Sequence, residues 1–275
     1  MHQLPIKAVK QLIKLENVCK TFNINTINEK KALNNINLSI ESGDFITVIG
    51  GNGAGKSTLL NLIAGVYPCE SGAITLDGSD ITTEPEYKRA KFLGRVFQDP
   101  MMGTAADMGI EENLAMAFRR GKKRGLHWGI SHEERTLYKE KLKTLDLGLE
   151  TRLSSKVGLL SGGQRQALTL LMATLQRPKL LLLDEHTAAL DLKTAKKVLE
   201  LTDSIVKRDS LTTLMVTHNM KDAIRMGNRL IMMHEGRIIL DIKGKDKENL
   251  QIKELLDMFE SASGNTMDND RMLLS

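Results

Sequence analysis

The chain alternates between two hydrophobic patterns. Short apolar runs, such as residues 45–49 and 180–183, are typical of strands buried on both faces. Longer segments repeat apolar positions every three or four residues, which favours helices. The predicted strands cover residues 13–18, 33–40, 45–49, 74–76, 180–183 and 212–218, with a hairpin over 229–241 that turns at 235–236. The predicted helices cover residues 59–64, 111–118, 134–147, 167–175, 195–206 and 252–259.

This order of elements predicts an α/β fold with a single domain over residues 1–275. Strand patterns dominate residues 12–101 and 161–245, which we expect to form the catalytic core. Helical patterns dominate residues 102–160, which favours an inserted helical lobe. Residues 246–275 are expected to form a helix and a polar tail that starts near Ser261. The first 12 residues are expected to form a loose leader.

Composition narrows the class of protein. Of 275 residues, 41% are hydrophobic and 27% charged, which is ordinary for a globular protein. The net charge of +5 is mild and no dense basic stripe occurs, so no nucleic-acid partner is expected. The run Arg119–Gly125 is interpreted as a solvated loop, with contact to lipid headgroups as an alternative. Two distant cysteines, no apolar run of about 18 residues and no signal peptide indicate a cytosolic protein.

The segment Gly50–Ser57 matches the phosphate-loop pattern G-x-x-x-x-G-K-[ST] between a predicted strand and a predicted helix. Glycines let backbone N–H groups approach an anion, and a helix start adds unpaired N–H donors. Lys56 would reach the β- and γ-phosphates, and the Ser57 hydroxyl would hold Mg²⁺. The alternative is a glycine-rich turn that binds nothing. The expected ATP-binding residues here are Gly50, Gly51, Asn52, Gly53, Ala54, Gly55, Lys56, Ser57 and Thr58.

A second set of glycines lies in Leu160–Gln166, "LSGGQRQ", before another predicted helix. Ser161 and Gln164 have the spacing of a capping box. That cap alone would explain both polar residues. Two adjacent glycines in a first helical turn are costly, at about 1 kcal/mol each against alanine, so we also expect a second anion site at Ser161, Gly162, Gly163 and Gln164.

Two carboxylates, Asp184 and Glu185, end the apolar run Leu180–Leu183. Ligands of open α/β sheets bind at the carboxyl ends of strands. Asp184 is expected to orient Mg²⁺ through water, and Glu185 to polarise an attacking water. A solvated strand-end pair is the alternative.

The phosphate loop, the Leu-Ser-Gly-Gly-Gln signature, the Asp-Glu strand end and Val216-Thr-His218 occur in that order. Together they resemble the ATP-binding cassette of ABC proteins over about residues 12–245. The resemblance implies a P-loop NTPase cassette with a mixed central sheet, an N-terminal antiparallel β-subdomain and an inserted helical subdomain. It also implies a head-to-tail homodimer that hydrolyses ATP with Mg²⁺ between one phosphate loop and the partner's serine-glycine cap.

The resemblance assigns roles to four more residues. Phe22 would stack on adenine, although it could be an ordinary core residue. Gln98 would touch Mg²⁺ and link the helical lobe to the core, or be a surface residue before a turn. His218 would contact the γ-phosphate, or be a bystander. Asp191 would cross the dimer interface, or cap a helix. The catalytic residues would be Glu185, His218 and Lys56, and the metal ligands Ser57, Gln98 and Asp184.

One residue departs from the family pattern, because His186 stands where proline usually follows the catalytic glutamate. Histidine would loosen the loop, titrate near neutral pH, or be a harmless lineage marker, which we favour.

The expected function is the ATPase subunit of an ABC transporter on the cytoplasmic face of the plasma membrane, with a separate permease and, indirectly, an extracellular solute-binding protein of the lipoprotein type. Import of a small solute is favoured, and some relatives of this subgroup are associated with aromatic amino acids. Three alternatives stay open at this point: the ATPase of an exporter, a soluble cofactor-assembly scaffold of the family, and an inactive regulatory cassette.

Overall fold

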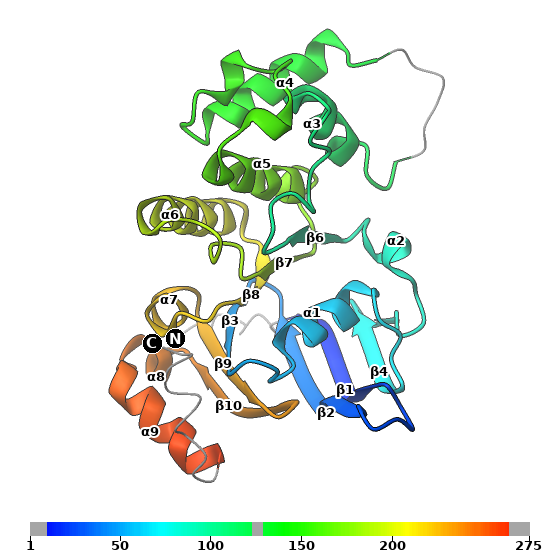
Figure 1. The fold of residues 1–275 in the computed structure, drawn as a ribbon, viewed down its shortest axis with the longest axis vertical. Helices are drawn as coiled ribbons and strands as arrows, with labels where there is room; N and C mark the ends of the chain where they lie inside the picture. The colour runs from blue at the N-terminus through cyan, green and yellow to red at the C-terminus, as the bar shows by residue number, and fades with distance from the viewer. Residues whose placement is uncertain (1–9, 123–128, 264–275) are drawn as a thin grey trace, which may run out of the picture.

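The computed structural model describes residues 10–122 and 129–263. Most of the predicted leader, part of the basic run 119–125 and the tail beyond residue 263 lie outside the described residues. The described part contains two sheets and a lobe of helices (Figure 1). The mixed central sheet, the antiparallel β-subdomain and the helical subdomain are the predicted architecture, and the fold class is confirmed.

The larger sheet forms the centre of the molecule. Its strand order is β10-β9-β3-β8-β7-β6, and all neighbours pair in parallel except the antiparallel β9–β10 hairpin. The five residues of β3 and of β8 are all buried, as the continuous apolar runs predict. The strands are β3 (Phe45–Ile49), β6 (Leu93–Val96), β7 (Leu180–Asp184), β8 (Thr212–Val216), β9 (Arg229–His234) and β10 (Arg237–Lys243).

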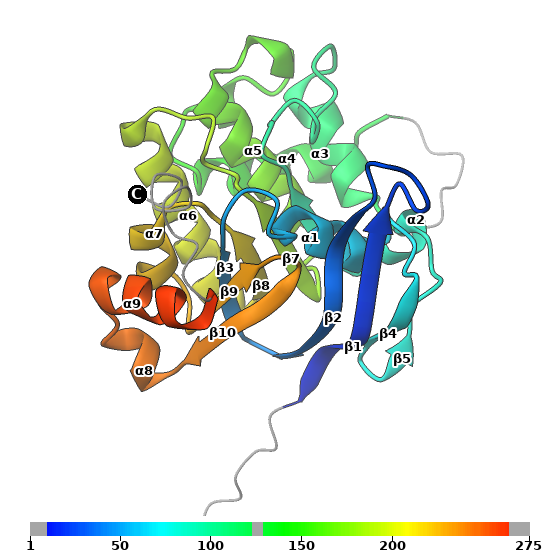
Figure 2. The same ribbon diagram turned by 60° about the horizontal axis from the view of Figure 1, so that its bottom comes forward.

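The smaller sheet is antiparallel, with the order β2-β1-β4-β5. Helix α1 packs between the two sheets, where Leu59, Leu60 and Ile63 are fully buried in one core with residues of both sheets (Figures 1 and 2). This packing fixes the start of α1 at the carboxyl end of β3. The strands are β1 (Gln11–Phe22), β2 (Lys30–Glu41), β4 (Ser71–Leu76) and β5 (Ser79–Asp80).

The helical lobe has a hydrophobic core of its own, formed by α3, α4 and α5. Helix α5 therefore belongs to the packing of the lobe as well as to the core, while α9 lies along β10 at the other end of the molecule (Figure 2). Among the described helices, none has the length and apolar character needed to cross a bilayer. The helices are α1 (Lys56–Ala64), α2 (Glu86–Arg89), α3 (Ile110–Phe118), α4 (His132–Lys143), α5 (Gly162–Thr174), α6 (Leu192–Asp209), α7 (Met220–Arg225), α8 (Lys245–Glu248) and α9 (Ile252–Ser263), with short 3₁₀ turns at Leu149–Thr151 and Val157–Leu159.

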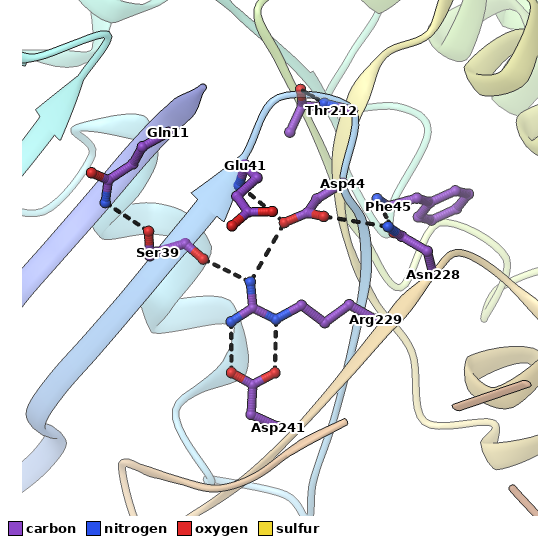
Figure 3. A network of polar contacts seen from close by, with 10 residues as sticks. Gln11, Ser39, Glu41, Asp44, Phe45, Thr212, Asn228, Arg229 and Asp241 are labelled. Atoms are coloured by element: carbon purple, nitrogen blue, oxygen red, sulfur yellow. Dashed lines mark hydrogen bonds and ion pairs between the residues drawn. The ribbon is translucent and has the colours of Figure 1, made fainter. Parts of the chain in front are cut away.

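A network of polar side chains, centred on the buried Arg229, joins the two sheets (Figure 3). Arg229, at the start of β9, donates two hydrogen bonds of 2.7 and 2.6 Å to the Asp241 carboxylate and one of 2.7 Å to the Ser39 carbonyl of β2. Its guanidinium also lies 3.5 Å from Asp44, whose carboxylate accepts from Asn228 at 3.3 Å. Arg229 of β9 thus contacts Ser39 of β2 and Asp241 of β10, and these contacts hold the three strands together.

The observed elements differ from the predicted ones mainly at their ends. The predicted helix 134–147 is wrong at its end, because α4 stops at Lys143 and Asp146 adopts a left-handed φ of 53° that breaks the helix. Strand β1 is longer than the predicted 13–18, since a bulge at Asn17, with φ 51°, interrupts the alternation. Helix α9 continues to Ser263, past the predicted start of the polar tail.

Candidate nucleotide-binding site

One pocket of about 320 Å³ lies at the carboxyl end of β3 and the start of α1. It brings together the phosphate loop and residues that the sequence places far from it, namely Phe22, Gln98 and Glu185. Predicted residues from four separate segments therefore share one cavity. The lining residues are Phe22, Lys30, Ala32, Asn52, Gly53, Ala54, Gly55, Lys56, Ser57, Thr58, Gln98 and Glu185.

Two glycines of the phosphate loop are required by the packing of the loop itself. Gly50 has a φ of 151°, and a Cβ atom there would lie 2.2 Å from the Met233 carbonyl oxygen. Gly55 has a φ of 100°, and its Cβ would lie 2.5 Å from the Ala32 carbonyl oxygen. Side chains are therefore excluded at both positions by backbone neighbours as well as by backbone conformation. Helix α1 begins at Lys56, directly after the loop, so its first backbone N–H groups have no partner within the helix.

The Lys56 side chain folds back over this loop. Its buried ammonium donates hydrogen bonds of 2.7 Å to the Gly50 carbonyl and 3.1 Å to the Gly51 carbonyl. Carbonyl oxygens hold the lysine at the bottom of the pocket, where its charge makes the loop attractive to phosphate.

Ser57 and Asp184 meet at the floor of the site. The Ser57 hydroxyl donates to Asp184 Oδ1 at 3.1 Å. Burial raises the pKa of Asp184 above its ordinary value, whereas the Ser57 hydrogen bond and the charge of Arg95, 3.9 Å from Oδ2, act in the opposite direction. With Gln98 nearby on the pocket wall, the donor set is all oxygen, which is the chemistry that Mg²⁺ prefers.

Glu185 follows β7 in a strained conformation. Its φ of 43° lies in the left-handed region, and its N–H donates to the Val216 carbonyl at 3.1 Å. Such strain in a non-glycine residue persists only where the surrounding structure enforces it, and it gathers at functional sites. The Glu185 carboxylate lies 3.8 Å from His218 Nδ1, so the structure brings the two predicted catalytic groups together. Asp184 and His218 are not among the residues that line the pocket surface.

Phe22 forms the outer wall of the pocket, and its half-buried ring packs edge-on against Tyr67 with 5.2 Å between ring centroids. It therefore lies at the surface of a cavity, in a place where a flat base could stack, and the interpretation as an ordinary core residue is wrong.

The predicted second anion site lies elsewhere in the chain. The capping box is confirmed, because Ser161 Oγ accepts from the Gln164 N–H at 3.3 Å and Gln164 Oε1 accepts from the Ser161 N–H at 3.2 Å. A Cβ atom on Gly163 would lie 2.1 Å from Thr194 Cγ2 of α6, so this glycine also has a packing role. Asp191 caps α6 by accepting from the Thr194 N–H at 3.0 Å. Residues 161–164 and Asp191 do not line the phosphate-loop pocket.

His186 is 2% exposed, and its Nε2 lies 3.0 Å from the Thr202 hydroxyl of α6. Burial lowers the pKa of this imidazole to about 4. The interpretation of His186 as a group that titrates near neutral pH is therefore wrong, because a neutral ring is packed into the core behind Glu185.

Sequence reasoning missed Lys30 and Ala32, which line the pocket from β2, and Tyr67, which supports Phe22. It also missed Arg95, the ion-pair partner of Asp184. The two lysines that begin β2, Lys30 and Lys31, were a weak signal for Lys30. No local pattern marks the other three, because their partners are distant in the chain.

A glycine loop between a buried strand and a helix, bordered by strand-end carboxylates, defines a P-loop nucleotide-binding protein. The model of the ABC transporter family matches residues 33–188. The chain belongs to this family as an ATP-binding cassette, and it is an ATP hydrolase.

Two relatives and two solved structures illustrate the match. The chain is 48% identical over 252 residues to the tyrosine transport ATP-binding protein of Clostridioides difficile, covering 91% of this chain and 100% of the relative. It is 35% identical to the spermidine/putrescine import ATP-binding protein PotA of Haemophilus influenzae, over 84% of this chain and 58% of PotA. The chain thus spans little more than half of PotA.

Among solved structures, a dimeric ATP-binding cassette in a post-hydrolysis state with ADP and Pi has a TM-score of 0.72 and 31% identity, over 84% of this chain and 98% of that one. The ADP conformation of another ABC transporter cassette has a TM-score of 0.73 and 26% identity, over 90% and 98%.

Proposed function

We propose that two copies of this ATP-binding subunit pair head to tail, close on ATP and Mg²⁺, and drive import of a small amino acid through a separate permease. The observation that carries the pairing is the separation of two glycine-rich helix starts, those of α1 and α5. The phosphate-loop pocket contains Glu185, yet it lacks residues 161–164, which form the start of α5, and a helix start attracts an anion. A second copy would bring that cap to the open side of the nucleotide.

The roles of the site residues follow from their positions. Lys56 and the loop N–H groups would bind the phosphates, and Phe22 would stack on the base. Ser57, Asp184 and Gln98 would hold Mg²⁺, which would offset the negative charge of the phosphates. Glu185 would orient and polarise the attacking water, with His218 beside the γ-phosphate.

The surface next to Asp191 supports the pairing. Leu192, the first residue of α6, is 91% exposed. A large apolar side chain beside a polar cap is what a partner subunit would cover. A solved cassette of the same fold, bound to ADP and Pi, is dimeric, which supports a pair of copies.

We place the permease contact on the helical lobe, residues 102–160, next to Gln98. Met102, Met116 and Leu159, at 70%, 41% and 72% exposure, are exposed on the described part of this lobe, and Met101, at 44%, directly precedes it. Methionine-rich surfaces adapt to apolar helices. Docking there would hold the protein at the cytoplasmic face of the plasma membrane, with an extracellular solute-binding protein on the opposite side.

The name of the C. difficile relative makes tyrosine the first cargo to test, and that of PotA favours import. The test is to co-express the chain with the products of its neighbouring genes, and to reconstitute in vesicles any complex that it forms with a multi-span protein and a solute-binding protein. We expect co-sedimentation, and ATP-dependent tyrosine uptake. A chain that never associates with such a protein would support the assembly-scaffold alternative, and efflux of tyrosine would support the exporter.

A further inference from the structure

Arg95 on β6 is a largely buried cation next to the carboxylate of Asp184. Its side chain is 13% exposed, and it carries contacts to three elements of the site. Its Nη2 donates a 2.6 Å hydrogen bond to Asn61 Oδ1 of α1 and lies 3.9 Å from Asp184 Oδ2 of β7. Its guanidinium carbon lies 4.5 Å from the centre of the Phe97 ring, immediately before Gln98.

The guanidinium of Arg95 is held loosely compared with that of a second buried arginine. Arg89 donates five hydrogen bonds to carbonyl oxygens of residues 62, 63, 81, 82 and 84, at 2.6 to 3.0 Å. In Arg95 the buried Nε has no hydrogen-bond partner, and the contact with Asp184 is too long for a hydrogen bond. A buried donor left unpaired is unfavourable. Hydrogen bonding therefore satisfies the Arg95 guanidinium less fully than that of Arg89, and does not by itself explain an arginine at this position.

The position of Arg95 has a direct electrostatic consequence. Asp184 presents one oxygen to the Ser57 hydroxyl and the other to the guanidinium. The Ser57 side is where we propose that Mg²⁺ binds. Two like charges that share one carboxylate in a partly buried site repel each other more strongly than they would in water.

We propose that Arg95 is a positioning residue that competes with the divalent cation for Asp184. This inference rests on the Mg²⁺ site proposed above. Without nucleotide, the guanidinium balances the buried carboxylate. When a divalent cation is bound, Asp184 turns its charge toward the metal and the guanidinium is left against Phe97. Arg95 therefore weakens the coupling between metal and nucleotide, and it links occupancy of the metal site to the segment that carries Gln98.

The test measures binding and does not depend on turnover. The affinity for the non-hydrolysable analogue AMP-PNP is determined by calorimetry at pH 8, with MgCl₂ and with EDTA, and the ratio of the two affinities measures the coupling between metal and nucleotide. Arg95→Gln keeps a donor toward Asn61 but removes the charge, and we expect this ratio to rise at least about threefold because the repulsion is lost. Arg95→Lys keeps the charge, and its ratio should stay within about twofold of the unchanged chain.

An unchanged ratio in Arg95→Gln, or an equal rise in Arg95→Lys, would overturn the proposal. Should Arg95→Gln not fold, Asn61→Asp supplies the second variant. It keeps Arg95 and gives the guanidinium a nearer anion, so the ratio should rise in the same direction, and no rise would again count against competition. The variant Asp184→Asn distinguishes the proposed Mg²⁺ site from the proposed role of Arg95. If Asp184→Asn leaves the magnesium effect intact, the proposed metal site is wrong, whereas loss of the effect together with an unchanged Arg95→Gln refutes only the role of Arg95.

Discussion

The burial of His186 makes the stability of the protein fall as the pH drops below neutrality. Burial lowers the pKa of His186 to about 4 from an ordinary value of 6.5. In the unfolded chain the imidazole takes up a proton as the pH falls through 6.5, whereas in the folded chain it does so only near pH 4. The unfolded state therefore binds more protons in this window, and stability falls with falling pH.

The size of the effect follows from the two pKa values. Each pKa unit corresponds to about 1.4 kcal/mol, so the full contribution is about 3 kcal/mol. The linkage relation gives a loss of about 2 kcal/mol between pH 7 and pH 5 from this residue alone. His186→Gln offers Thr202 a polar partner of similar reach but does not take up a proton. This variant should therefore lose about 2 kcal/mol less than the unchanged chain over the same interval.

The assay is urea unfolding at pH 7 and pH 5, without nucleotide and with EDTA. His132→Gln, which removes an exposed histidine at the start of α4, is the control for loss of a histidine as such. If His186→Gln and the unchanged chain lose equal stability between the two pH values, His186 is not buried as a neutral group and the reasoning fails.

Three further predictions concern the phosphate loop, the glycines after Ser161 and the polar network around Arg229. Lys56→Met should weaken ATP binding more than about tenfold, since a charge-assisted contact is lost, whereas Lys30→Met, at the exposed start of β2 beside Gly53, should have a smaller effect; equal losses by calorimetry would contradict the assigned role of Lys56. Gly163→Ala should lower the free energy of unfolding by a net of about 1–2 kcal/mol, because the clash with Thr194 exceeds the gain of about 1 kcal/mol in helix propensity, and adding Thr194→Ser should restore it; no recovery in the double variant would refute this packing role. Arg229→Met should cost about 1–3 kcal/mol because it leaves the buried Asp44 without its cation, whereas the exposed Asp241 can be hydrated, while exposed Arg237→Met should change stability by less than about 0.5 kcal/mol; similar urea midpoints for the two variants would show that the Arg229 network is unimportant.

The sequence predicted the features that depend on neighbouring residues. Strand β3, the phosphate loop and the cap at Ser161 were found because the apolar run, the glycines and the Ser–Gln spacing all lie within a few positions. The length of β1 was missed because a left-handed Asn17 resets its alternation.

Contacts between distant residues could not be found in this way. Arg95 is separated by 34 residues from Asn61 and lies on a different strand from Asp184. Similarly, nothing in the local pattern shows that Thr202, 16 residues from His186, would face its ring. Only the packing of α6 and β6 on β7 brings these groups together, and tertiary packing is not encoded in a short window of sequence.

The central claim is that ATP is bound between two copies of the chain. The most direct test is the molar mass of the Glu185→Gln variant in solution with ATP. In light scattering with excess ATP and MgCl₂, we expect this variant to have twice the 30.6 kDa mass of the chain, because nucleotide persists between the copies. Adding Ser161→Arg should return the mass to that of one copy while calorimetry still detects ATP binding. A Glu185→Gln protein that remains monomeric when saturated with ATP, or a double variant that remains dimeric, would contradict the account.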